Sequence, residues 1–138
     1  ESFDAILGKG ILHHLDLDAA VPEIRRVLRP GGKAVFLEPL VHNPILESYR
    51  RLTPHLRSPT EKALSAEDMK RIGRCFAKWA HREFCLLAVL PILADALIFR
   101  RPTLARYLPW LRRLDSTLLQ LVPPIWRYYW ETVMVLEK

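Results

Sequence analysis

The chain has 138 residues, of which half are hydrophobic and about a quarter are charged. This composition excludes a disordered or collagen-like chain and suits one globular domain with its own core. The net charge of +6 favours anionic partners such as phospholipid headgroups, nucleotides or nucleic acid, without choosing among them. The two cysteines, Cys75 and Cys85, form no CxxC pair, so we expect no disulfide framework and a reducing, cytoplasmic environment.

The N-terminal residues do not resemble a secretion signal, because they lack a basic segment followed by a long apolar run. The longest apolar stretch, residues 86–99, is shorter than the roughly 20 residues that cross a bilayer, so we expect it to lie on a membrane at most. There is no initiating Met, and Phe3 already begins an apolar run. We therefore expect a fragment that starts inside a domain.

The first forty residues carry the pattern of a β-α-β unit. Residues 3–7 (FDAIL) and 33–37 (KAVFL) are short apolar runs typical of buried strands. Residues 17–29 repeat apolar side chains at helical spacing behind an N-terminal Asp, and residues 30–32 (PGG) are predicted to end the helix in a turn. Such a unit predicts two parallel strands joined by a right-handed crossover.

The rest of the chain is predicted to alternate helices with two further strands. Ser65 opens a capping box, which predicts a helix start. The final segment, YYWETVMVL, is rich in aromatic and β-branched residues and favours a strand. The expected elements are a helical piece at 45–52 within a polar loop at 41–60, a helix at 65–76, a strand at 79–87, helices at 86–99 and 104–122, and a strand at 128–136.

Four short motifs follow one another at the start of the chain. They are residues 3–7 (FDAIL), 10–15 (GILHHL), 26–32 (RVLRPGG) and 36–39 (FLEP). The series resembles that of the class I S-adenosylmethionine (SAM)-dependent methyltransferases of the type 11, small-molecule family, over residues 3–39. Residues 65–72 resemble the helix that follows in that family.

The resemblance implies an α/β fold: a partial Rossmann-like methyltransferase sheet, made of the fourth to seventh strands, with additional C-terminal helices. Residues 1–138 would be the C-terminal part of a single methyltransferase domain. Residues 1–40 would form its β-α-β core, residues 41–78 a loop and helix, and residues 79–138 a strand, a helical insertion and the final strand. The implied activity is methyl transfer from SAM to an O, N or C atom of a small, hydrophobic molecule.

The resemblance places Gly8, Lys9 and Gly10 beside the cofactor, at the carboxyl end of the family's fourth strand. Small residues suit that position because the backbone must approach the ligand closely. An ordinary left-handed turn after a strand would explain the same glycines without any ligand.

The resemblance places His13, His14 and Glu38 near the methyl acceptor. A histidine there could act as a base, and a carboxylate at a strand end could orient the substrate or accept a proton. The alternatives are that the histidines cap and pack local backbone and that Glu38 is a solvated or paired strand terminus. The scattered His and Cys residues offer no chelating pair, so we expect no metal site.

The sequence lacks the glycine-rich loop that carries most cofactor contacts in the family. None of its five glycines forms GxGxG or GxGxxG. We therefore predict that an N-terminal half is missing, and that the isolated chain binds SAM weakly or not at all. A split enzyme completed by a second polypeptide is the alternative.

A basic, amphipathic run follows residue 99. Five arginines alternate with leucines and with Tyr107 and Trp110. This pattern fits a lid over a hydrophobic substrate or peripheral contact with an anionic membrane, and also a helix that packs on its own core. It supports the competing function, a non-catalytic basic module that binds a membrane surface or a protein partner. No motif points to nucleic acid.

Overall fold

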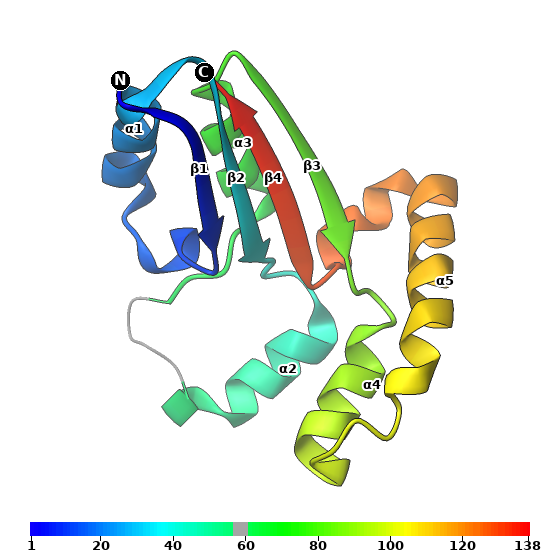
Figure 1. The fold of residues 1–138 in the computed structure, drawn as a ribbon. Coiled ribbons are helices and arrows are strands. Elements are labelled where there is room, and N and C mark those ends of the chain that lie inside the picture. Colours follow the sequence, from blue (N-terminus) through cyan, green and yellow to red (C-terminus); the bar gives the residue numbers. More distant parts are fainter. Residues whose placement is uncertain (57–60) are drawn as a thin grey trace.

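We describe the fold from a computed structural model, which describes residues 1–56 and 61–138. Four strands form one sheet in the order β1-β2-β4-β3 (Figure 1). β1 (Phe3–Lys9) pairs in parallel with β2 (Leu28–Pro39), whereas β4 (Glu131–Glu137) runs antiparallel to both β2 and β3 (Lys78–Phe84). β1, β2 and β3 therefore share one direction, and their carboxyl ends lie at one edge of the sheet.

Five α-helices accompany the sheet among the described residues: α1 (Leu17–Val27), α2 (Pro44–Leu52), α3 (Ala66–Arg74), α4 (Val89–Ala94) and α5 (Leu108–Leu121). A π-helical turn, Asp95–Phe99, extends α4, and a 3₁₀ turn, Pro123–Tyr128, follows α5. The expected β-α-β unit and the later order of helices and strands are confirmed. The part of the predicted loop at residues 57–60 lies outside the described residues.

Local chemistry explains where the helices begin. Asp16 accepts the backbone N–H of Asp18 ahead of α1, and Asn43 accepts two backbone N–H groups ahead of α2. The predicted capping box is present at α3, where the Ser65 hydroxyl accepts the Asp68 N–H and the Asp68 carboxylate accepts the Ser65 N–H.

The predicted helix-ending turn at residues 30–32 is wrong in one respect, because α1 ends earlier and these residues lie inside β2. The parallel register between β1 and β2 is irregular here, so β2 bulges between Leu28 and Lys33. Gly31 adopts a φ of +76°, which glycine tolerates. Its N–H donates to the carbonyl of Lys138, so the far end of the chain holds the bulge in place.

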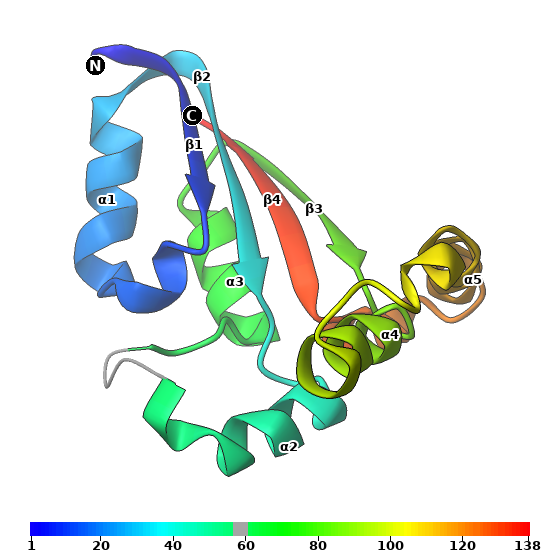
Figure 2. The same cartoon turned by 60° about the horizontal axis from the view of Figure 1, so that its bottom comes forward.

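The core lies between α1 and α3 and one face of the sheet, here the covered face (Figure 2). Phe36, Met134 and Leu136 of the sheet pack there with Val21 of α1 and with α3. The side chains that alternate with them form the open face, whose strand residues include Leu7, Val35, Leu37, Val133 and Val135. Leu7, on the edge strand β1, is 81% exposed.

Candidate functional site

The carboxyl ends of β1, β2 and β3 form the edge of the sheet where doubly wound folds bind ligands. The loop after β1, residues 10–14, and the end of β2 meet at this edge. The structure brings His13 and Glu38 into direct contact there, with Gly10 beside the His13 ring, whereas Gly8 packs against Phe36 and Ile11.

Glu38 is fully buried and holds the loop after β1. Its Oε1 accepts the backbone N–H groups of Ile11 at 2.9 Å and Leu12 at 2.8 Å, and its Oε2 lies 3.4 Å from the backbone N of His13. These amides begin the 3₁₀ turn Leu12–His14, where backbone donors lack helical partners. The carboxylate therefore closes the turn from the neighbouring strand.

His13 is oriented by the same carboxylate. Its Nδ1 lies 2.7 Å from Glu38 Oε2, and because the carboxylate accepts, Nδ1 donates its hydrogen in this contact. Nε2 is then the nitrogen that can accept a proton. His14 is exposed and its ring centroid lies 4.1 Å from that of His13, so only one of the two histidines has the buried partner.

The two predicted glycines pack closely against their neighbours. A Cβ on Gly8 would lie 2.4 Å from the Phe36 ring, so packing inside the sheet is enough to require glycine there. Gly10 has a φ of +60°, and a Cβ on it would lie 3.4 Å from the His13 ring. Lys9 is exposed at the end of β1, on the open face.

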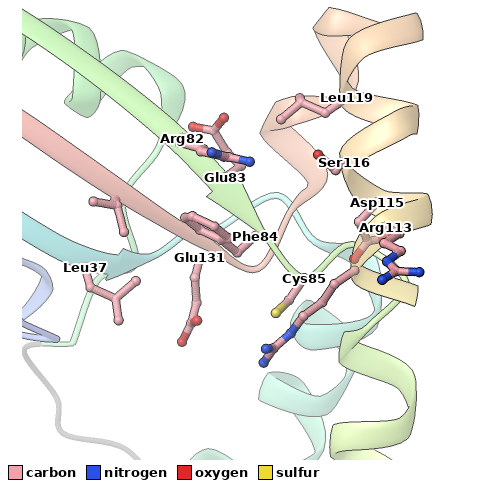
Figure 3. A pocket seen from close by; sticks show the side chains of 12 residues that line it. Leu37, Arg82, Glu83, Phe84, Cys85, Arg113, Asp115, Ser116, Leu119 and Glu131 are labelled. Carbon is pink, nitrogen blue, oxygen red and sulfur yellow. The ribbon is translucent and has the colours of Figure 1, made fainter. Parts of the chain in front are cut away.

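A cavity of about 530 Å³ lies at the same edge, between the open face and α5 (Figure 3). Its walls combine apolar and charged side chains: Leu37, Phe84, Leu119 and Val133 with Arg82, Arg112, Arg113 and Glu131 among others. Burial raises the pKa of the Glu131 carboxyl, and the nearby Lys9 and Arg112 oppose the shift. Sequence analysis missed Glu131, because it stands inside an apolar strand pattern that gave no signal for a site.

Cys85 lines this cavity but is poorly suited to nucleophilic chemistry. It adopts a φ of +65° directly after β3 and is buried. Burial raises the pKa of its thiol, with a further increase from Glu131, so little reactive thiolate forms at neutral pH.

Asp115 of α5 holds the loop after β3 in the way that Glu38 holds the loop after β1. Its buried carboxylate accepts the backbone N–H groups of Leu86 at 3.0 Å, Leu87 at 2.8 Å and Ala88 at 3.2 Å. The Tyr129 hydroxyl donates to the carbonyl of the same Asp115. Sequence analysis missed this residue too, because a lone Asp in a basic amphipathic helix looks solvated.

A second buried glutamate, Glu83, lies in the row of the sheet that contains Glu38 and Thr132. The Thr132 hydroxyl donates to Glu83, and His81 Nδ1 contacts the same carboxylate. The His81 ring lies between Trp79 and Trp126, with centroid separations of 5.2 and 5.0 Å. These contacts satisfy the buried glutamate, which also lines the cavity beside α5, and they do not reach the carboxyl edge of β1.

Within residues 1–56 and 61–138, no cluster of three His, Cys, Asp or Glu side chains could hold a metal ion. In the same part of the chain, no helix is long and apolar enough to span a bilayer.

Comparison with known families matches residues 1–36 to a methyltransferase domain. These residues contain β1, the loop held by Glu38, α1 and most of β2. None of the curated proteins matches the chain.

Solved structures with the same fold include two SAM-dependent methyltransferases. Phosphoethanolamine N-methyltransferase 2 of Haemonchus contortus, in complex with S-adenosyl-L-methionine, is 18% identical with a TM-score of 0.56, over 99% of this chain and 33% of its own. A SAM-dependent methyltransferase of Archaeoglobus fulgidus is 14% identical with a TM-score of 0.54, over 99% of this chain and 60% of its own.

The chain therefore spans between one third and three fifths of the length of these structures. The Haemonchus enzyme is also known with phosphomonomethylethanolamine and S-adenosylhomocysteine, and that structure matches with 16% identity and a TM-score of 0.53 over 98% of this chain and 33% of its own. The match at residues 1–36 and the shared α/β fold confirm the resemblance to class I SAM-dependent methyltransferases.

Proposed function

We propose that this chain is part of an enzyme that transfers a methyl group from SAM to an O, N or C atom of a small, partly hydrophobic molecule. The methyltransferase-domain match carries the proposal, because it covers the strand, loop and helix that build the carboxyl edge of the sheet. The fold shared with two SAM-dependent methyltransferases supports it.

The cofactor supplies an electrophilic methyl group, and its transfer depends mainly on the alignment of donor and acceptor. Gly8, Lys9 and Gly10 are the proposed cofactor neighbours. Gly10 fits this role because its positive φ turns the chain at the end of β1, where a side chain would be strained and would meet the His13 ring. Gly8 already has a structural explanation in Phe36, so Gly10 is the more informative position.

For an acceptor that must lose a proton, we propose His13 as the base and Glu38 as the positioning residue. The 2.7 Å contact with the buried carboxylate fixes the ring and leaves Nε2 to accept a proton. Glu38 itself already accepts hydrogen bonds from the loop amides, so it acts through His13. His14, exposed beside it, is a proposed acceptor contact without a fixed partner.

The cavity beside α5 is the proposed place for the body of the acceptor. Its volume of about 530 Å³ is in the range of small-molecule sites, and its walls combine apolar surface with arginines. Glu131 is a second group that could orient the acceptor or take a proton, because its raised pKa makes it a stronger base than an ordinary carboxylate.

The active enzyme, we propose, contains a further half that pairs with β1 and covers the open face. Two observations support this. β1 is an edge strand with an exposed apolar residue, Leu7, and edges of this kind favour pairing with another strand. Sheets with parallel strands are normally covered on both faces, whereas α1 and α3 cover only one here.

The proposal is tested by binding and turnover. We expect S-adenosylhomocysteine to bind, by calorimetry, to the chain joined to its proposed N-terminal half, at one site, and only weakly to the 138-residue chain. Gly10→Val should abolish binding, while Lys70→Gln on the exposed face of α3 should not change it. Binding that Gly10→Val leaves unchanged would remove the assigned cofactor site.

Turnover separates the two proposed bases. With phosphoethanolamine as the first acceptor tried, or another that must lose a proton, His13→Asn should lower kcat by roughly 100-fold or more if His13 is the base. Glu131→Gln should leave the rate nearly unchanged in that case. The reverse pattern would assign the base to Glu131, and two active variants would show that the reaction needs neither.

The competing function is a non-catalytic module that binds an anionic membrane or a protein partner. The arginine-rich helices after β3 favour it, whereas the methyltransferase-domain match at residues 1–36 argues against it. Membrane contact and methyl transfer are compatible in one protein, so the turnover experiment decides whether the module is also an enzyme.

A further inference from the structure

The segment after β3 projects away from the sheet as a helical hairpin (Figures 1 and 2). We define the hairpin as residues 89–121, from the start of α4 to the end of α5. Its far end contains the π-helical turn Asp95–Phe99 and the connection to α5.

Large apolar side chains are exposed at this far end. Leu97 is 53% exposed, Ile98 73% and Trp110 64%. They are not part of the core, which lies on the covered face of the sheet. Large apolar side chains exposed at the end of one helical hairpin can form a surface that meets another apolar phase or partner.

The charge of the hairpin has a single sign where it faces outward. Residues 96–114 contain five arginines and no acidic residue. The acidic residues at the two ends of this stretch are both engaged internally. Asp95 accepts the N–H of Leu104 at 2.9 Å, and Asp115 accepts the loop amides after β3.

An apolar groove runs between the two helices of the hairpin. Its volume is about 420 Å³. Its lining residues are mostly apolar, and their polar side-chain groups are the Tyr107 hydroxyl and the Trp110 indole N–H: Leu90, Pro91, Ala94, Leu104, Tyr107, Trp110 and Leu111. Tyr and Trp beside apolar surface are typical of the membrane–water interface, where one end of the ring is buried and the other is hydrated.

We propose that the hairpin binds the surface of an anionic phospholipid membrane, with its far end in the headgroup region and the groove against the acyl chains. The uniform positive charge matches a uniformly negative surface, and the exposed apolar side chains supply the part that enters it. The binding does not depend on the proposed methyl transfer and needs no cofactor.

Flotation with lipid vesicles tests the proposal on the whole chain. Vesicles of equal parts phosphatidylcholine and phosphatidylserine should carry the protein upward, and vesicles of phosphatidylcholine alone should carry little of it. Arg100→Gln with Arg101→Gln should lower the partition coefficient roughly 25-fold, because each cation near the surface contributes about five-fold. Ile98→Ser with Trp110→Ser should also lower it.

The matched control is Lys70→Gln with Arg74→Gln, which removes two exposed cations from α3. It should bind the anionic vesicles as the unchanged chain does, and circular dichroism should show that all variants are folded. Equal binding to both kinds of vesicle, or an equal loss in the control, would overturn the proposal. Sedimentation without vesicles tests a different occupant. If the chain is a dimer and Ile98→Ser with Trp110→Ser makes it a monomer, the face binds a second copy of the chain instead.

Discussion

Two loops at the same edge of the sheet are closed in the same way but from different places. A buried carboxylate accepts the backbone amides of the loop after β1 and of the loop after β3. In the first case Glu38 belongs to the adjacent strand, whereas in the second Asp115 belongs to α5. The first loop is therefore fixed within the sheet, and the second depends on the docking of the hairpin.

The difference indicates which loop is suited to hold reacting groups. The loop after β1 also carries His13, whose ring is oriented by the carboxylate that binds the amides. The loop after β3 carries Cys85, whose buried thiol is unreactive, and leads into the hairpin. We infer that rigidity supports chemistry at the first loop and that the second connects the sheet to a surface-binding element.

Removing Glu38 should have the largest effect on stability. Glu38→Ala leaves the amides of Ile11 and Leu12 without their acceptor inside the core, and it frees His13. We expect a loss of about 3–5 kcal/mol in the free energy of unfolding, measured with urea. Glu38→Gln keeps one acceptor oxygen and should lose less. A change under about 1 kcal/mol in Glu38→Ala would show that water replaces the carboxylate.

Removing Asp115 should have a smaller and more local effect. Asp115→Ala leaves the amides of Leu86, Leu87 and Ala88 unpaired, but the hairpin can move away from the sheet and expose them to water. We expect a loss of about 2–3 kcal/mol in the free energy of unfolding. Hydrogen exchange should become faster at residues 86–88 and stay unchanged at residues 11–13. An equal increase in the hydrogen-exchange rates of both loops would show that the two loops are not independent.

Filling the space at Gly8 should cost less again. The Cβ of Gly8→Ala would overlap the Phe36 ring, and we expect about 1–3 kcal/mol of destabilisation because the strands must shift. Gly31→Ala is the comparison, since no atom lies within 4 Å of the added carbon and only its positive φ is strained, at about 1 kcal/mol. A smaller loss at Gly8 than at Gly31 would mean that the ring moves freely.

The last effect, a pH dependence at the second loop, should appear only in alkaline solution. Burial, with the charges of Asp115 and Glu83, raises the pKa of Tyr129 from 10.0 to about 12. The unfolded chain therefore loses this proton before the folded one does, so the stability from the neutral phenol is complete below pH 10 and declines between pH 10 and about 12. Tyr129→Phe should remove that decline. If the free energy of unfolding of the variant still falls with pH over this range, the decline belongs to other groups.

The elements that sequence analysis predicted best are those set by local chemistry. β1, α1 and the capping box of α3 follow from apolar spacing and from Asp16 and Ser65, which lie within a few residues of the helices they start. The bulge in β2 could not be predicted from Gly31 alone, because the carbonyl that accepts its N–H belongs to Lys138, at the other end of the chain.

The same distinction holds for the site. The family resemblance placed His13, Glu38 and Gly10 at one edge, but it could not say that Glu38 binds the loop amides. That role depends on a contact across 25 to 27 positions of the chain. Asp115 gave no signal at all, because its charge is matched by amides rather than by a basic side chain.

Hydrogen exchange with and without S-adenosylhomocysteine, on the chain joined to its proposed N-terminal half, tests the central claim most directly. The claim is that the loop after β1, and not the loop after β3, borders the methyl donor. The account predicts slower exchange at residues 9–13 on binding and no change at residues 86–88. Slower exchange at residues 86–88 alone, or no protection at residues 9–13 with the ligand bound, would contradict it.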